Sequence, residues 1–240
     1  MFLDHIVHFT KLEPAKAVQA WGSYGFHAAM GGQHVQWGTH NALFYMKDCY
    51  IEWLALADLS VAERANHPLT KLLLHDEEGL GTICLRTDDI ASLDTRLRKE
   101  GFETTGVLDA ERKTGTGETI RWKMLFIEQE VTDALSAPFF IEWRQSDSER
   151  YSALRERDAI KPDNEKLSVE VCVFGVHDIP ASEALFRKIL QGKLEVENCR
   201  FEFRETARRK ERLEEVLLAG GTKRVVFEEG VYCVPETGNI

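Results

Sequence analysis

The sequence has no excess of basic residues and no long apolar run. Its 30 Lys and Arg against 40 Asp and Glu give a net charge of −10, which argues against nucleic acid and anionic membranes as partners, because phosphate contacts need a basic surface. No stretch approaches the roughly 20 apolar residues of a spanning helix. The segment MFLDHIVHFT also lacks the basic start and apolar run of a secretory signal. We therefore expect a cytoplasmic protein that binds neither nucleic acid nor membrane.

Several catalytic motifs are missing as well. The 5 cysteines are odd in number and show no C-x-x-C spacing, so we expect buried thiols rather than disulfides or zinc ligands. No glycine-rich phosphate loop follows a strand, and no G-x-S-x-G elbow occurs. Nucleophilic hydrolysis is therefore disfavoured.

What is present is one order of elements that occurs twice. The first copy is predicted as a strand at 3–10, a helix at 14–25 and a hairpin at 41–56. The second copy is predicted as a strand at 80–87, a helix at 89–101 and strands at 119–128 and 138–145. Glycines and polar residues predict a loop or irregular strand at 28–40 and a loop at 107–119. Laying the first strands on each other makes His5 equivalent to Thr82.

The repeat predicts an α+β protein with three modules. Two β-α-β-β-β modules span about 1–58 and 79–146, joined by a helical connector at 59–78, and a charged linker follows at 147–166. Residues 167–240 form a degenerate third β-α-β module, which lacks a glutamate in its closing strand. Its predicted elements are strands at 167–176 and 199–205, helices at 181–190 and 207–220, and a hairpin at 223–235.

The segments CYIEWLAL (49–56) and PFFIEWRQ (138–145) each place one glutamate in an apolar run. Strand alternation puts Glu52 on one face with Tyr50 and Leu54, and Glu142 on one face with Phe140, with both tryptophans pointing the other way. An isolated buried carboxylate costs several kcal/mol if it is ionised, so each glutamate needs a cation or a proton.

Two arrangements satisfy the glutamates. In one, His5, Glu52 and Glu142 hold a divalent metal, and this donor set suits zinc, manganese, nickel or ferrous iron. In the other, both glutamates pair with arginines such as Arg86 and Arg144, and His5 is a half-buried histidine bonded to the backbone. The sequence leaves both alternatives open, a site with a bound metal and a site without one.

The segments LDHIVHF, GGQHVQWGTHN, YIEWLA and PFFIEW resemble the glyoxalase-like branch of the vicinal oxygen chelate superfamily. That superfamily includes glyoxalase I, extradiol dioxygenases and bleomycin-resistance proteins. The resemblance covers about residues 1–146 and implies paired modules that curl into an open barrel-like curved mixed sheet around a metal. Position by position it implies His5, Glu52 and Glu142 as ligands. Thr82 takes the fourth position and departs from the pattern, so water, substrate or His34 must complete the shell.

The resemblance implies a cavity for a small molecule. His34 and Asn41 are predicted to face this ligand, with surface hydrogen bonding or a turn role as the alternative, and Arg112, Trp122, Phe140 and Thr82 are further predicted contacts. The implied function is a metal-dependent lyase, isomerase or dioxygenase for a carbonyl or vicinal-oxygen substrate, with Glu52 or Glu142 as general base or acid. The alternative is a metal-free binding protein of the bleomycin-resistance type. A monomer and a homodimer both remain open.

Overall fold

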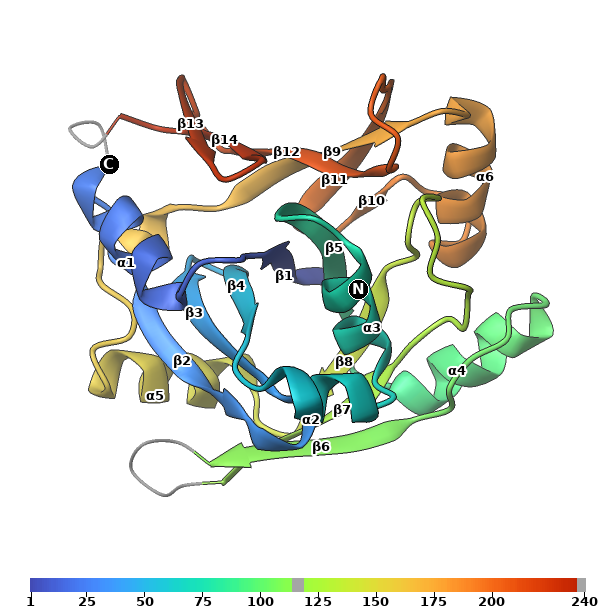
Figure 1. Ribbon diagram of the computed structural model, residues 1–240, viewed down its shortest axis with the longest axis horizontal. Coiled ribbons are helices and arrows are strands. Elements are labelled where there is room, and N and C mark those ends of the chain that lie inside the picture. The colour runs from blue at the N-terminus through green and yellow to red at the C-terminus, as the bar shows by residue number, and fades with distance from the viewer. Residues whose placement is uncertain (114–118, 237–240) are drawn as a thin grey trace.

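The computed structural model describes residues 1–113 and 119–236, without the side chains of residues 112 and 113. Two mixed β-sheets form the core of the fold, and helices pack against them (Figure 1). The larger sheet is strongly curved, and the smaller sheet lies across its outer face (Figure 1). This arrangement confirms the predicted α+β class with paired modules on a curved sheet.

The larger sheet contains eight strands in the order β2-β3-β4-β1-β5-β8-β7-β6. In chain order they are β1 (Phe2–Phe9), β2 (Ala29–His34), β3 (Thr39–Tyr45), β4 (Tyr50–Leu56), β5 (Gly79–Arg86), β6 (Leu108–Lys113), β7 (Thr119–Leu125) and β8 (Phe139–Trp143).

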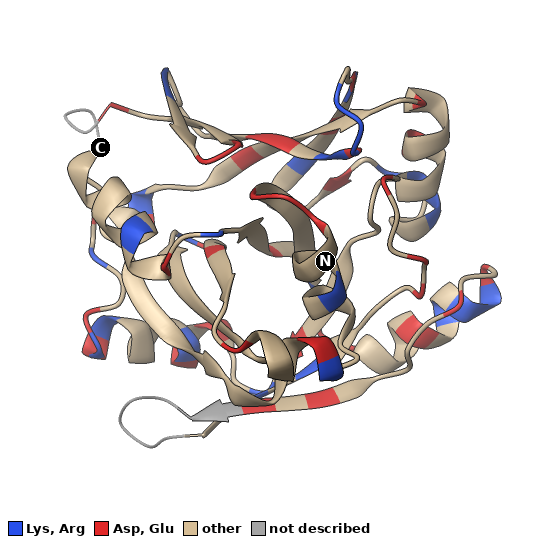
Figure 2. Cartoon of the chain, in the orientation of Figure 1, with Lys and Arg blue, Asp and Glu red and all other residues tan. Residues whose placement is uncertain are grey.

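The helices lie between strands or in the segments that connect the modules. They are α1 (Pro14–Ser23), α2 (Leu59–Arg64), α3 (Pro68–His75), α4 (Ile90–Lys99), α5 (Asp147–Glu156) and α6 (Ile179–Ile189), with short 3-10 turns η1 (Val35–Trp37) and η2 (Asn164–Lys166). Figure 2 shows the charged residues mainly on the helices, the turns and the second sheet.

An approximate twofold relation between the modules follows from the central strand pair. β1 and β5 are antiparallel, with His5 opposite Cys84 and Val7 opposite Thr82. These two pairs exchange places if His5 is equivalent to Thr82 and Val7 to Cys84. Each central strand also pairs in parallel with the closing strand of its own module, β4 or β8. The register shifts of this pair leave one extra residue at Asp4 in β1 and one at Gly81 in β5. These are 77 positions apart, like His5 and Thr82, which supports the predicted equivalence.

The smaller sheet has the strand order β10-β11-β9-β12-β14-β13. Its strands are β9 (Val169–Val176), β10 (Glu195–Val196), β11 (Cys199–Glu205), β12 (Arg212–Leu218), β13 (Lys223–Phe227) and β14 (Gly230–Val234). Buried Leu3 and Ile83 of the larger sheet share one apolar core with Phe174 and Val216 of the smaller sheet. The second sheet thus covers the outer face of β1 and β5.

Two predicted elements are wrong. Residues 207–220 were predicted as a helix because Leu213 and Val216 lie three apart, yet the segment contains strand β12. A β-bulge in β12, seen as a register shift after Leu213, buries two residues at this helix-like spacing. The predicted loop at 107–119 contains strand β6, whose charged side chains hid an edge strand that pairs with β7. No described helix is long and apolar enough to cross a membrane.

Candidate functional site

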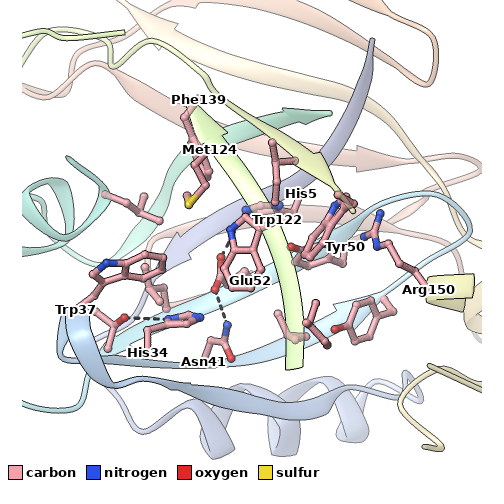
Figure 3. Close-up of a pocket in the computed structure, with 18 of the residues that line it drawn as sticks. His5, His34, Trp37, Asn41, Tyr50, Glu52, Trp122, Met124, Phe139 and Arg150 are labelled. Carbon is pink, nitrogen blue, oxygen red and sulfur yellow. Dashed lines mark hydrogen bonds and ion pairs between the residues drawn. The ribbon is translucent and has the colours of Figure 1, made fainter. Parts of the chain in front are cut away.

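A cavity lies in the hollow of the larger sheet, between the strands of both modules. Water-sized spheres placed in it have about 90 Å³ for their centres, so the cavity is small, and it is partly open to solvent. Its walls are largely apolar, and they include Trp37, Leu54, Trp122, Met124, Phe139 and Trp143. Figure 3 shows Glu52 between Trp37 on one side and Arg150 on the other. The cavity wall is therefore mostly apolar, with a few polar groups.

Glu52 is held on the cavity wall by Asn41 from the neighbouring strand. The Asn41 Nδ2 group donates to Glu52 Oε1 at 2.5 Å (Figure 3), and the Gly32 N–H donates to Asn41 Oδ1 at 2.9 Å. A Cβ atom at position 31 would lie 1.8 Å from Asn41 Oδ1, so only glycine leaves room for the Asn41 side chain. Gly31 thus lets Asn41 fix the carboxylate of Glu52, whose side chain is only 9% exposed.

Asp4 lies behind His5 and is fully buried. Its Oδ2 accepts hydrogen bonds from Arg86 Nη1 at 3.1 Å and Trp143 Nε1 at 2.9 Å. Burial alone would raise the pKa of Asp4, but Arg150, the hydrogen bond and charge of His5, and the charge of Arg86 outweigh burial and lower the pKa well below its usual value. Asp4 is therefore ionised at neutral pH.

His5 connects Asp4 to Glu52. Its Nδ1 lies 2.8 Å from Asp4 Oδ1, and its Nε2 lies 3.6 Å from Glu52 Oε2. The ring stacks on Tyr50 with centroids 4.6 Å apart. Because an ionised carboxylate only accepts hydrogen bonds, Nδ1 of His5 must carry a proton, and Nε2 faces Glu52. The result is a row of carboxylate, imidazole and carboxylate that ends at the cavity.

The prediction that Glu142 and Phe140 face the cavity is wrong. Strand β8 turns Phe139, Ile141 and Trp143 toward the cavity instead. The Glu142 carboxylate lies on the other face, where Oε2 accepts from the Ile90 N–H at 2.8 Å and Oε1 accepts from Lys123 Nζ at 3.0 Å. The structure therefore does not bring Glu142 together with His5 and Glu52.

The strand register explains this error. Val7 pairs with Glu52, and its equivalent Cys84 pairs with Phe139. Phe139, three residues before Glu142, thus takes the place of Glu52 in the second module. An odd shift turns every side chain to the opposite face. The shared Ile-Glu-Trp letters were therefore no guide to structural equivalence.

Glu142→Gln is expected to lower the free energy of unfolding by about 1 kcal/mol, because Glu142 binds the first N–H of α4 and pairs with Lys123. Binding in the cavity should not change. Urea unfolding and ligand titration measure the two effects. Glu130→Gln is the control, because Glu130 is exposed. A loss of ligand binding in Glu142→Gln would contradict this assignment.

Two of the other predicted residues, His34 and Trp122, line the cavity with His5, Asn41 and Glu52. His34 Nδ1 lies 3.0 Å from Thr39 Oγ1. Thr82 is buried and lines a neighbouring pocket, which shares His67 and Phe139 with the main cavity.

Arg112 lies opposite Ile120 in the β6–β7 pair. Its side chain is outside the described part of the structure.

Residues from the two connecting segments also line the cavity, and no spacing along the chain identifies them. His67, just before α3, stacks on Trp37 with ring centroids 4.2 Å apart. Neither ring nitrogen of His67 has a hydrogen-bond partner among the described residues. Burial, and then the charge of His34, lower the pKa of His67 to about 3, so the ring is neutral at pH 7. From α5 and the turn after it, Arg150 and Arg157 reach the opposite end.

Residues 3–190 match the model of the glyoxalase-like domain family, which is more than half of the chain. The chain belongs to this family. The predicted resemblance to the glyoxalase-like branch of the vicinal oxygen chelate superfamily is thereby confirmed. Comparison with curated proteins gave no match.

Among solved structures, a hypothetical protein from Staphylococcus aureus is similar to this glyoxalase-like chain over nearly its whole length. The TM-score is 0.79 at 22% identity, with 96% of this chain and 97% of that chain covered. Methylmalonyl-CoA epimerase from Streptomyces coelicolor has a TM-score of 0.41 at 17% identity, covering 60% and 99% of the two chains. The Mycobacterium tuberculosis methylmalonyl-CoA epimerase has a TM-score of 0.40 at 15% identity, covering 62% and 91%.

The donor set of this glyoxalase-like chain is a poor fit to a metal held by both modules. The first module supplies His5 and Glu52, but the equivalent positions of the second module hold Thr82 and Phe139. A phenyl ring supplies no ligand atom, and a neutral threonine is a weak one. Two strong protein ligands remain where the resemblance implied three.

A second grouping of donor atoms, Asp4, His5 and Cys84, lies beside this pair, with atoms within 4.8 Å of one another. Burial raises the pKa of the Cys84 thiol well above its usual value, which disfavours the thiolate that metals bind. Asp4 is already bound by Arg86 and Trp143. Asp4 and His5 therefore belong to a hydrogen-bonded network, and the three groups together are a poor metal shell.

Proposed function

We propose that this glyoxalase-like chain is an acid–base enzyme that moves a proton on a small, largely apolar carbonyl compound. The observation that carries the proposal is the row formed by Asp4, His5 and Glu52 at the wall of an apolar cavity. Glu52 acts as the general base, and Asn41 holds its carboxylate in place. The chemistry rests on side chains alone, because the second module supplies Thr82 and Phe139 in place of metal ligands.

The proton transfer follows from the positions of the two groups. Glu52 takes a proton from the carbon next to the carbonyl, and the electron pair of the broken C–H bond moves into an enolate. The negative charge then lies on the carbonyl oxygen, which needs a hydrogen-bond donor, and Nε2 of His5 is the polar atom beside Glu52 that would supply it. Asp4 lies behind the ring and orients it through Nδ1. Return of the proton to a different face or atom completes an epimerisation or isomerisation.

The apolar walls support this chemistry. Trp122, Met124 and Phe139 surround the space beside Glu52 (Figure 3). A ligand that enters this space replaces the water there and is shielded from solvent. Hydrogen bonds to the developing charge are stronger in such a setting than in water.

Deuterium exchange tests the proposal. Phenylacetone (1-phenylpropan-2-one) carries exchangeable protons next to its carbonyl group, and NMR in D₂O follows their loss. The wild-type protein is expected to accelerate exchange above the buffer rate, before and after treatment with EDTA.

The other outcomes separate the alternatives. Binding without exchange would assign the cavity to a metal-free binding protein of the resistance type. Exchange that is lost on chelation and restored by zinc, manganese, nickel or ferrous iron would assign the chemistry to a bound metal. Either result overturns the proposed side-chain mechanism.

A further inference from the structure

Helix α5 forms one end of the cavity, although its sequence is typical of a charged linker. Tyr151 and Leu154 pack with Leu43, Tyr45 and Tyr50 of the larger sheet, and the Tyr151 hydroxyl donates to the Met46 carbonyl at 2.9 Å. The helix is thus fixed against the sheet. Its inner side, together with the turn that follows it, contributes Arg150 and Arg157 to the cavity wall.

The end of the cavity at α5 carries arginines, unlike the acidic chain as a whole. Among the described residues that line the cavity, Arg150 and Arg157 lie at this end, and Glu52 is the one carboxylate. The chain as a whole has a net charge of −10. A cationic end inside an acidic protein favours an anion at that end over an anion elsewhere on the surface.

The two arginines are not equivalent. Arg150 lies 3.1 Å from Asp147 Oδ1 and 3.7 Å from Asp4 Oδ2, and its guanidinium lies 4.0 Å from the centre of the Trp143 ring. Its charge is therefore matched within the protein. Arg157 is half-buried and donates from Nε to the Ala153 carbonyl at 3.1 Å. Its two Nη groups bind no described residue, so they are available to a ligand.

We propose that the ligand carries a carboxylate and that Arg157 binds it, which sets the substrate class as small apolar keto acids or related monoanions. This inference rests on the proposed function, because Glu52 must face the reacting carbon at the other end of the same ligand. One unmatched guanidinium suits a monoanion, and its two Nη groups can donate to both carboxylate oxygens. Trp143, Tyr50 and Leu154 supply apolar wall around this end.

A matched pair of probes tests the inference. Phenylpyruvate and phenylacetone share the ring and the carbonyl group, and differ by a carboxylate in place of a methyl group. Calorimetry is expected to show that the wild type binds phenylpyruvate at least tenfold more tightly. Arg157→Gln should lose at least tenfold in affinity for phenylpyruvate and less than about twofold for phenylacetone, because only the charged pair is removed.

Arg155→Gln is the control, since Arg155 lies in the last turn of α5 two residues before Arg157, is exposed, pairs with Glu165 and does not line the cavity. It should bind both probes as the wild type does. A second measurement needs no variant: raising the salt concentration from about 0.01 M to about 1 M should weaken binding of phenylpyruvate but not of phenylacetone. This salt series decides the matter if Arg157→Gln fails to fold.

The outcomes distinguish this inference from the proposed function. Equal wild-type affinity for the two probes, or an unchanged affinity of Arg157→Gln for phenylpyruvate, overturns the carboxylate assignment and leaves proton transfer by Glu52 standing. Binding that depends on Arg157 but is accompanied by no deuterium exchange overturns the proton transfer alone. Binding of neither probe overturns both.

Discussion

Replacing Glu52 with Gln is expected to slow deuterium exchange of phenylacetone by at least a hundredfold. A positioned general base contributes roughly 10²- to 10⁴-fold to such a step, and glutamine keeps the size of the side chain while removing the base. The glutamine oxygen can still accept the Asn41 hydrogen bond, so the cavity should keep its shape. The loss should therefore appear in kcat, with little change in KM.

Glu142→Gln is the matched control for this experiment, because Glu142 lies on the closing strand of the second module with its carboxylate outside the cavity. It should exchange deuterium at the wild-type rate. If Glu52→Gln and Glu142→Gln were equally active, Glu52 would not be the base. If Glu142→Gln alone were slow, the assignment of the two glutamates would be reversed.

Asp4→Asn is expected to have the largest effect on stability, lowering the free energy of unfolding by about 3–5 kcal/mol. The change removes a buried negative charge and leaves Arg86 with a neutral partner. The added amide hydrogens also face donors from Trp143 and Arg86. Urea unfolding at neutral pH measures the loss.

Asp147→Asn is the control, since Asp147 pairs with Arg86 and Arg150 but has a side chain that is 53% exposed. Exposed ion pairs contribute at most about 1 kcal/mol, so this variant should be nearly as stable as the wild type. Equal losses from Asp4→Asn and Asp147→Asn would show that burial of Asp4 is not what makes its charge important.

The effect of Asp4 should also depend on pH in a defined direction. Its pKa is lowered in the folded protein, whereas an unfolded aspartate has a pKa of about 3.9. The unfolded chain therefore binds the proton first as the pH falls, and the stabilisation is complete above about pH 4 and declines below it. The difference between wild type and Asp4→Asn should shrink over the same range.

The first module shows how far the sequence alone could go. Period-two alternation placed Glu52 on the correct face, and the position of His5 in the first strand placed it in the same hollow. His34 and Asn41 were found because their segment lacks the spacing of a core strand. These inferences needed only local patterns, and the structure brings all four residues to one cavity.

The second module and the connecting segments show where local patterns stop. Glu142 was misplaced because a match of three letters cannot reveal an odd shift in strand register. Arg157 and His67 lie in polar segments, and only the packing of α5 and α3 against the sheet turns them toward the ligand space. Such contacts are long-range, and no spacing along the chain encodes them.

The second sheet also limits how genes of this family can recombine. The family match ends at residue 190, and a crossover there would take β9 from one parent and its neighbours β11 and β12 from the other. Phe174 of one lineage would then have to fit Phe201 and Leu213 of another inside a close-packed core. A crossover within residues 147–166 leaves each sheet with all of its strands from one parent. We therefore expect recombination in this family to exchange whole sheets more often than single β-α-β-β-β modules.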